Sequence, residues 1–149
     1  MANTTRLGRQ QDRTRYVLGF AFNEARTRVV LIHRNHGPIA GHWNGLGGEV
    51  YPRESYRQAM RREFFEESGV LTGSWKQSAI IEMDHSRIHV FWTILAPRDW
   101  RRIKADRTQP EAVTRVSIKA LPESAFPDIR YLIALCWAYT VVKIDRRGL

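Results

Sequence analysis

The stretch GEVYPRESYRQAMRREFFEESGV, residues 48–70, decides the interpretation of this chain. Residues 54–68 contain no glycine or proline and many helix-favouring residues, so we predict a helix over this range. Three glutamates, Glu63, Glu66 and Glu67, fall at positions i, i+3 and i+4, which places them on one helical face. Like charges at these spacings destabilise a helix, by a few tenths of a kcal/mol per pair.

The acidic face has two interpretations on spacing alone. Mg²⁺ takes oxygen ligands and is usually held by a few carboxylates together with substrate phosphates. A bound metal would offset both the carboxylate repulsion and the phosphate charge. The alternative is a solvated acidic face without a ligand. We expect Phe64 and Phe65 to anchor the helix to the core, and Gly69 to end it as a left-handed C-cap.

The whole segment resembles the Nudix box, G-x5-E-x7-R-E-U-x-E-E-x-G-U, where U is an apolar residue. All specified positions match: Gly48, Glu54, Arg62, Glu63, Phe64, Glu66, Glu67, Gly69 and Val70. The resemblance implies a loop–helix–loop in which Glu63, Glu66 and Glu67 serve metal ions, Mg²⁺ or Mn²⁺. It also implies that Glu54 and Arg62 hold loop and helix in place, and that the Gly47 carbonyl is a further metal ligand.

The same resemblance implies a hydrolase acting on an acid anhydride. Water would attack phosphorus in a nucleoside diphosphate linked to a further group, and the barrier is mostly positioning and charge. One carboxylate would accept the proton of the water. Glu63, Glu67 and a glutamate outside the box are the candidates in such enzymes. Glu111 is the candidate outside the box, and its alternative interpretation is an ordinary exposed loop residue.

The flanking residues are similar to those of MutT-type enzymes, which hydrolyse normal or oxidised purine nucleoside triphosphates to a monophosphate and pyrophosphate. In GHWNGLGGEV (41–50), Asn44 is the candidate base reader, or simply a residue that favours a left-handed turn. Phe126 would stack on the base, or pack in the core. Asp128 would hydrogen-bond the purine edge, or cap a helix. Arg34 is a candidate phosphate contact at the end of a predicted strand.

Two positions depart from the animal oxidised-purine triphosphatases. Ile129 stands where those enzymes have a second aspartate, and Pro38 stands where they have an aromatic residue. The preference for oxidised purines therefore stays open at this point.

Composition limits the class of protein. The 149 residues suit one domain, and a hydrophobic content of 43% is enough for a core. The net charge of +9 favours polyanionic partners. A single cysteine, Cys136, excludes an intrachain disulfide and lies in an apolar run typical of a core. The N-terminus lacks an apolar stretch, so we expect no signal peptide, no membrane association and a cytoplasmic location.

The chain is predicted to contain a polar arm (1–13) and a single domain (14–149). The expected fold is α+β, an α/β/α sandwich with a central mixed sheet, as the resemblance also implies. Predicted strands cover 14–22, 28–34, 74–83, 87–96 and 114–120. Predicted loops cover 35–48, rich in Gly and Asn, and 97–111, which is charged. A closing helix is predicted over 129–144, and the preceding Pro127-Asp128 can start it.

Three other functions stay open. Removal of pyrophosphate or a cap from an RNA 5′ end is favoured by the charge and by a basic, aromatic cluster: Trp100, Arg101, Arg102, Lys104 and Arg107. The cluster is otherwise a solvated loop. A diadenosine polyphosphate or nucleotide sugar is another substrate class. A non-catalytic nucleotide- or RNA-binding domain is disfavoured because Glu54, Glu63, Glu66 and Glu67 are all present. Nothing selects an oligomeric state.

Overall fold

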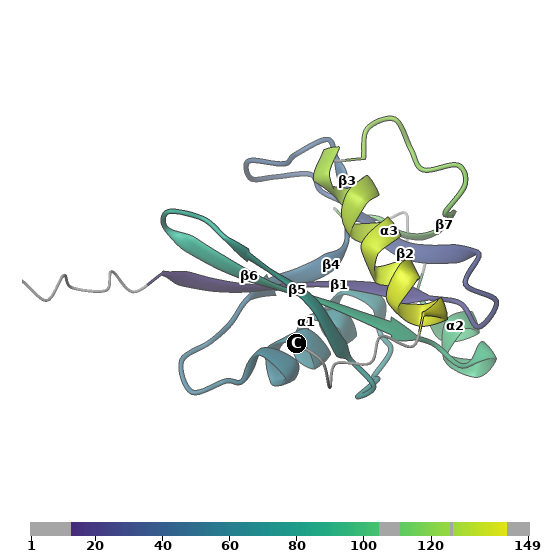
Figure 1. Ribbon diagram of the computed structural model, residues 1–149, viewed down its shortest axis with the longest axis horizontal. Helices are drawn as coiled ribbons and strands as arrows, with labels where there is room; N and C mark the ends of the chain where they lie inside the picture. The colour runs from purple at the N-terminus through teal and green to yellow at the C-terminus, as the bar shows by residue number, and fades with distance from the viewer. Residues whose placement is uncertain (1–12, 105–110, 126, 143–149) are drawn as a thin grey trace, which may run out of the picture.

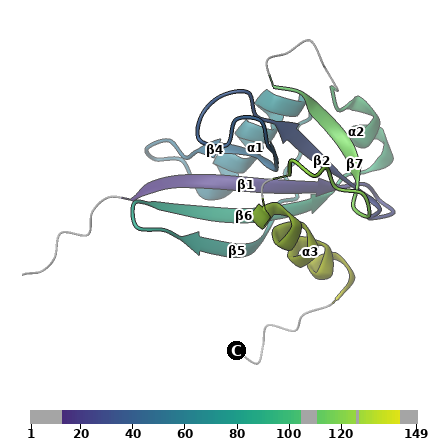
Figure 2. The ribbon, with the colours of Figure 1, turned by 90° about the horizontal axis from the view of Figure 1, so that it is seen from above.

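The computed structural model describes residues 13–104, 111–125 and 127–142. Its centre is a mixed sheet in the order β3-β2-β1-β6-β5, with β4 also paired to β1 and β7 to β2. The strands are β1 (Thr14–Phe22), β2 (Arg28–His33), β3 (Trp43–Asn44), β4 (Leu46–Glu49), β5 (Lys76–Glu82), β6 (Ser86–Ile94) and β7 (Val113–Ser117). The helices are α1 (Tyr56–Ser68), α2 (Pro97–Arg102) and α3 (Pro127–Val141). Helices α1 and α3 lie on opposite faces of the sheet (Figures 1 and 2), which confirms the predicted sandwich.

The central strands bury both of their faces. In β1, Val17 and Ala21 face the core under α1, whereas Leu18 and Phe20 face the core under α3. This double burial explains why the predicted strands read as nearly continuous apolar runs rather than as alternating ones. β1 pairs in parallel with β6 along its whole length, which sets Tyr16 opposite Ile88.

Local signals at both ends define α1. The Ser55 side chain accepts a hydrogen bond from the Gln58 backbone N–H, and the Gln58 side chain accepts one from the Ser55 N–H. This capping box satisfies two amide groups that the helix leaves free. Gly69 ends the helix in the left-handed region with φ 75°. Phe64 is fully buried, but Phe65 is half exposed, so the expectation that both phenylalanines anchor the helix was wrong for Phe65.

The predicted loop over 35–48 is partly wrong, because β3 and β4 lie within it. These short strands have few β-branched or aromatic residues. β3 pairs with β2, and the pairing of β4 depends on close approach to β1. A Cβ added to Gly47 would lie 2.0 Å from the Val17 carbonyl oxygen. The left-handed angles expected for this glycine-rich stretch do occur, at Gly37 and Gly41.

The predicted loop over 97–111 was wrong at its start, where α2 forms. Pro97 occupies the first helical position, where its missing N–H costs nothing. Arg115 of β7 donates to the carbonyl oxygens of Trp100, Arg101 and Ile103, which satisfies the C-terminal end of the helix. A smaller difference is that β7 ends at Ser117, whereas α3 begins at Pro127, where the sequence allowed a helix to start. The stability of α2 depends on Arg115 of β7, which is distant in sequence, so local sequence patterns do not predict this helix.

None of the helices in the described ranges has the length and apolar character needed to cross a membrane.

Cys136 of α3 is fully buried, with its Sγ 3.2 Å from the Ser78 Oγ. Burial raises the pKa of its thiol to about 11. Because the thiolate is the reactive form, we expect alkylation by iodoacetamide at pH 8 to be roughly 100-fold slower in the folded protein than in denaturant. The chain has no other thiol, so mass spectrometry of the intact protein reports this site alone. Equal rates in the two states would contradict the burial of Cys136.

Candidate active site

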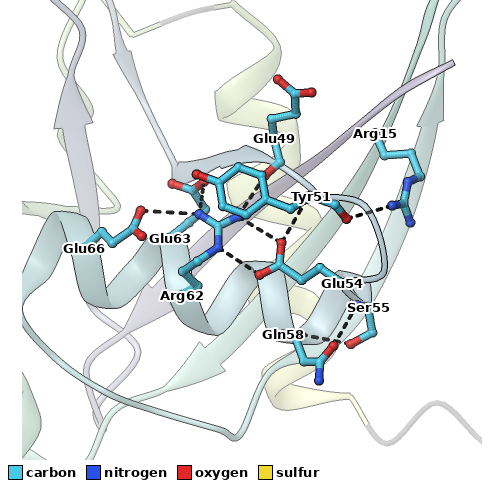
Figure 3. Close-up of polar contacts among 9 residues, drawn as sticks. All are labelled: Arg15, Glu49, Tyr51, Glu54, Ser55, Gln58, Arg62, Glu63 and Glu66. Carbon is cyan, nitrogen blue, oxygen red and sulfur yellow. Dashed lines mark hydrogen bonds and ion pairs between the residues drawn. The ribbon is translucent and has the colours of Figure 1, made fainter.

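Arg62 of α1 joins the helix to the loop that precedes it (Figure 3). Its Nε and Nη2 donate to the two carboxylate oxygens of Glu54, at 2.8 and 3.0 Å. Nη2 also donates to the Glu49 carbonyl at 2.9 Å, and Nη1 donates to Glu63 at 2.7 Å. The guanidinium carbon lies 3.9 Å from the centre of the Tyr51 ring. A planar, five-donor group suits this number of acceptors, and a lysine would not replace it.

Glu54 completes this link from the loop side. Its second carboxylate oxygen accepts a hydrogen bond from the Tyr51 N–H at 3.0 Å. The hydrogen bonds from Arg62 hold the pKa of the Glu54 carboxyl below its ordinary value. The loop from β4 into α1 is therefore fixed by charged hydrogen bonds, which are stronger than neutral ones.

The three glutamates of α1 have different surroundings. Glu63 and Glu67 are mostly buried, with side chains 14% and 13% exposed, whereas Glu66 is 51% exposed. Glu63 reaches the glycines of β4, because a Cβ added to Gly48 would lie 2.5 Å from its carboxyl group. Glu67 accepts a hydrogen bond from the Gly47 N–H at 3.0 Å. The face predicted from the spacing exists, with Glu66 at its solvent edge.

Burial is the main cause that raises the pKa of Glu67 to about 8; the nearby charges of Glu63 and Glu111 add to this effect, whereas Arg34 and the Gly47 N–H oppose it. A carboxylate held in such surroundings is costly to ionise without a compensating positive charge. Arg34, at the end of β2, supplies part of that charge. Its Nη1 lies 3.3 Å from Glu67 and donates to Glu111 at 2.9 Å, and its Nη2 donates to the Gly47 carbonyl at 3.1 Å.

The donor set fits a hard cation. Glu63, Glu67, Glu111 and the Gly47 carbonyl offer only oxygen, the ligand type that Mg²⁺ prefers. One oxygen of Glu111 is buried without a hydrogen-bond partner among the described residues, although the His36 ring lies 3.4 Å away. Within the same residues, no three His, Cys, Asp or Glu side chains converge tightly enough to form a ready metal cage. The arginines Arg34 and Arg62 hold the carboxylates instead.

A cleft of about 400 Å³ opens beside these carboxylates. Its lining combines an apolar floor from β1 and β6 with the polar groups of the box and the loop after β2: Tyr16, Val17, Leu18, Arg34, His36, Gly37, Pro38, Ile39, Asn44, Gly47, Gly48, Ile88 and Glu111. A concave site with few polar groups at one end is typical of small-molecule binding. The sequence did not indicate Tyr16, Leu18, Ile88 or His36, because strand pairing and loop placement bring them there.

The candidate base-pocket residues are not all brought together. Asn44 lines the cleft, and its Oδ1 accepts a hydrogen bond from the Gly45 N–H at 2.8 Å. Asp128 is exposed in the first turn of α3, whose start at Pro127 excludes the N-cap role, and it does not line the cleft. Ile129 is 1% exposed in the core under α3, so this position does not face a ligand. Phe126 lies outside the described residues.

Four members of the basic cluster lie in α2 or directly after it, and of these Arg101, Arg102 and Lys104 are exposed. Trp100 packs against the core under α1, and the Arg115 guanidinium lies over its ring. Lys104 lies against Gly69, beside a second cavity of about 420 Å³ that is lined also by Glu66, Glu67 and Glu111. Glu111 lines the cleft as well. Arg107 lies outside the described residues. Because Trp100 packs against the core, its ring is not free to stack on a nucleic-acid base as the alternative interpretation required.

Comparison with known proteins decides the family. The sequence profile of the NUDIX domain matches residues 12–136. The chain belongs to the NUDIX family. A curated relative, the oxidized purine nucleoside triphosphate hydrolase of Danio rerio, is 40% identical over 70 residues. That alignment covers 43% of this chain and 45% of the relative, less than half of either protein.

Solved structures share the Nudix fold. A MutT structure from work on Aliivibrio salmonicida and Vibrio cholerae has a TM-score of 0.61 and 23% identity, covering 82% of this chain and 98% of its own. The NUDIX domain of Shewanella oneidensis NrtR, complexed with ADP ribose, has a TM-score of 0.65 and 17% identity, covering 86% and 88%. At these identities the likeness concerns the fold alone, and fold does not determine the substrate.

The Arg62–Glu54 link gives a pH-dependent contribution to stability. We expect Glu54→Gln to lower the free energy of unfolding by about 1–3 kcal/mol at pH 7, because it removes charged hydrogen bonds from a mostly buried pair. Since the pKa of Glu54 is lowered on folding from 4.5, its contribution is full above 4.5 and is lost as the pH falls through the lower folded-state pKa. Urea unfolding of both proteins at pH 7 and at pH 3 measures this. A difference independent of pH would contradict it.

Gly48 of the box and Gly47, which precedes it, are expected to differ in what they tolerate. Gly47→Ala would press a Cβ against backbone of β1, 2.0 Å from the Val17 oxygen, and we expect a loss of about 3 kcal/mol in the free energy of unfolding. Gly48→Ala meets only the movable end of Glu63, so a loss below about 1 kcal/mol is expected. Urea unfolding of the two variants side by side provides the comparison. Equal losses would show that β4 does not approach β1 as closely as the structure has it.

Proposed function

We propose that this Nudix protein is a Mg²⁺-dependent pyrophosphohydrolase that converts a purine nucleoside triphosphate to the monophosphate and pyrophosphate. The observation that carries the proposal is that Arg34 joins Glu67, Glu111 and the Gly47 carbonyl, while Arg34, Glu111, Gly47 and Gly48 line a nucleotide-sized cleft. The Glu63 carboxyl group lies against Gly48. The site has more carboxylates than guanidinium groups, so it favours a cation, and the cation in turn favours phosphate.

Each part of the site has a role in this proposal. Glu63, Glu67 and the Gly47 carbonyl would hold a divalent cation, which when bound would supply charge neutralisation and Lewis-acid polarisation of the phosphate. Arg62 and Glu54 keep the box loop and α1 in register for it. Glu67 and Glu111 are the best-placed carboxylates to accept the proton of the attacking water, because both lie beside Arg34, and Arg34 and Glu111 line the cleft. Mn²⁺ is the alternative metal.

The preference for a purine rests on Asn44 and on the curated relative that acts on oxidized purine nucleoside triphosphates. With its Oδ1 engaged by the Gly45 N–H, Asn44 can present its amide Nδ2 as a donor to the cleft. A donor recognises the acceptor edge of a 6-oxopurine better than the amino group of adenine. A contact of this type discriminates strongly, since the wrong base leaves a polar group unpaired.

The test is a product assay with Mg²⁺ and a panel of dGTP, 8-oxo-dGTP, ATP, a diadenosine polyphosphate, ADP-ribose and 5′-triphosphate RNA. We expect pyrophosphate and a monophosphate from the guanine nucleotides. Faster cleavage of the RNA would instead assign the activity to RNA 5′ ends. Binding of any of these compounds without turnover would favour a non-catalytic domain and contradict the proposal.

Glu67→Gln tests the role of the buried carboxylate. We expect turnover to fall by orders of magnitude, roughly 100-fold or more, because a cation ligand or proton acceptor is lost. The thermal midpoint should change little, since glutamine has nearly the same size and its amide oxygen can still accept the hydrogen bond from the Gly47 N–H. Glu24→Gln, in the exposed turn between β1 and β2, is the matched control and should keep full turnover. Undiminished turnover in Glu67→Gln would remove the assigned role.

A further inference from the structure

Arg34 is placed where the proposed cation must bind. Its guanidinium contacts three acceptor oxygens at once: Gly47 O at 3.1 Å, Glu111 Oε2 at 2.9 Å and Glu67 Oε1 at 3.3 Å. The side chains of Arg34, Glu67 and Glu111 are each less than one fifth exposed. Two of the three groups, Glu67 and the Gly47 carbonyl, are the proposed cation ligands.

A divalent cation and this guanidinium are poor neighbours. Both are positive, and repulsion at contact distance is strong in a mostly buried site. They would also compete for the carboxylate oxygens of Glu67 and for the Gly47 carbonyl. The Arg34 side chain has space to move into the cleft, because it lines the cleft along with Asn44 and Gly48. There its planar fork of donors matches the oxygens of a phosphate.

We propose that Arg34 is an internal counter-cation of the metal-free site, and that cation binding displaces it from Glu67 and Gly47 so that it turns into the cleft to bind substrate phosphate. This inference rests on the proposed function. It makes cation binding and phosphate binding cooperative, because the cation releases the residue that the phosphate needs. By linkage, the phosphate then favours the cation to the same degree.

The first test measures Mn²⁺ binding without nucleotide, and electron paramagnetic resonance reports the concentration of the free ion. We expect Arg34→Gln to bind Mn²⁺ roughly tenfold more tightly than the wild type, because its competitor is gone. Arg61→Gln removes the same charge from an exposed position on α1 and should bind like the wild type. Unchanged or weaker binding by Arg34→Gln would overturn the inference.

The second test does not depend on that variant being folded. Arg34→Lys keeps the charge but cannot span three acceptors, so its Mn²⁺ affinity should lie above that of the wild type. In the wild type, the Nε–Hε signal of ¹⁵N-labelled Arg34 should shift on addition of Mg²⁺ more than that of Arg61. An Arg34 signal that does not move at saturating Mg²⁺ would refute the displacement.

The measurements distinguish failure of the proposed function from failure of the proposed role of Arg34. A wild type that binds neither Mn²⁺ nor Mg²⁺ would sink the proposed function and this inference together. A wild type that binds the ion, with Arg34→Gln no tighter, would leave the proposed hydrolase intact and remove only the role of Arg34 as a competitor.

Discussion

The guanidinium of Arg62 is the interaction on which the geometry of the site depends. It binds Glu54 in the loop, the Glu49 carbonyl at the end of β4, and Glu63 on its own helix. Three segments thus have one common donor group, which fixes the distance between β4 and α1. Because this distance sets how close Glu63 lies to Gly48, the structural and the chemical roles of the box cannot be separated.

The site is acidic, although the chain as a whole carries a net positive charge. The net charge is +9, yet Glu63 and Glu111 lie close enough to Glu67 for their charges to help raise its pKa. Such a cluster is unfavourable unless cations accompany it. The two arginines Arg34 and Arg62 fill that need within the protein. The basic remainder can still draw phosphate compounds toward the cleft from a distance.

Close packing around Gly47 and Gly48 explains why these two positions must lack a side chain. At Gly47 the backbone of β1 leaves no room for a Cβ, and at Gly48 the carboxyl of Glu63 takes that room. β4 is therefore pressed between β1 and α1. This contact presents the N–H of Gly47 to Glu67 and its carbonyl to Arg34.

The sequence by itself determined α1, its left-handed end at Gly69, the face that bears the three glutamates and most strands of the sheet. These follow from local patterns: helix-forming composition, i to i+4 spacing and runs of β-branched residues. The pairing of β4 with β1, the support of α2 by Arg115 and the exposure of Phe65 and Asp128 were not predictable in this way. Each depends on which distant segment lies alongside, and that is a property of the folded sheet. The meeting of Arg34 with Glu67, Glu111 and Gly47 belongs to the same class, since it requires β2, α1, β4 and the start of β7 to converge.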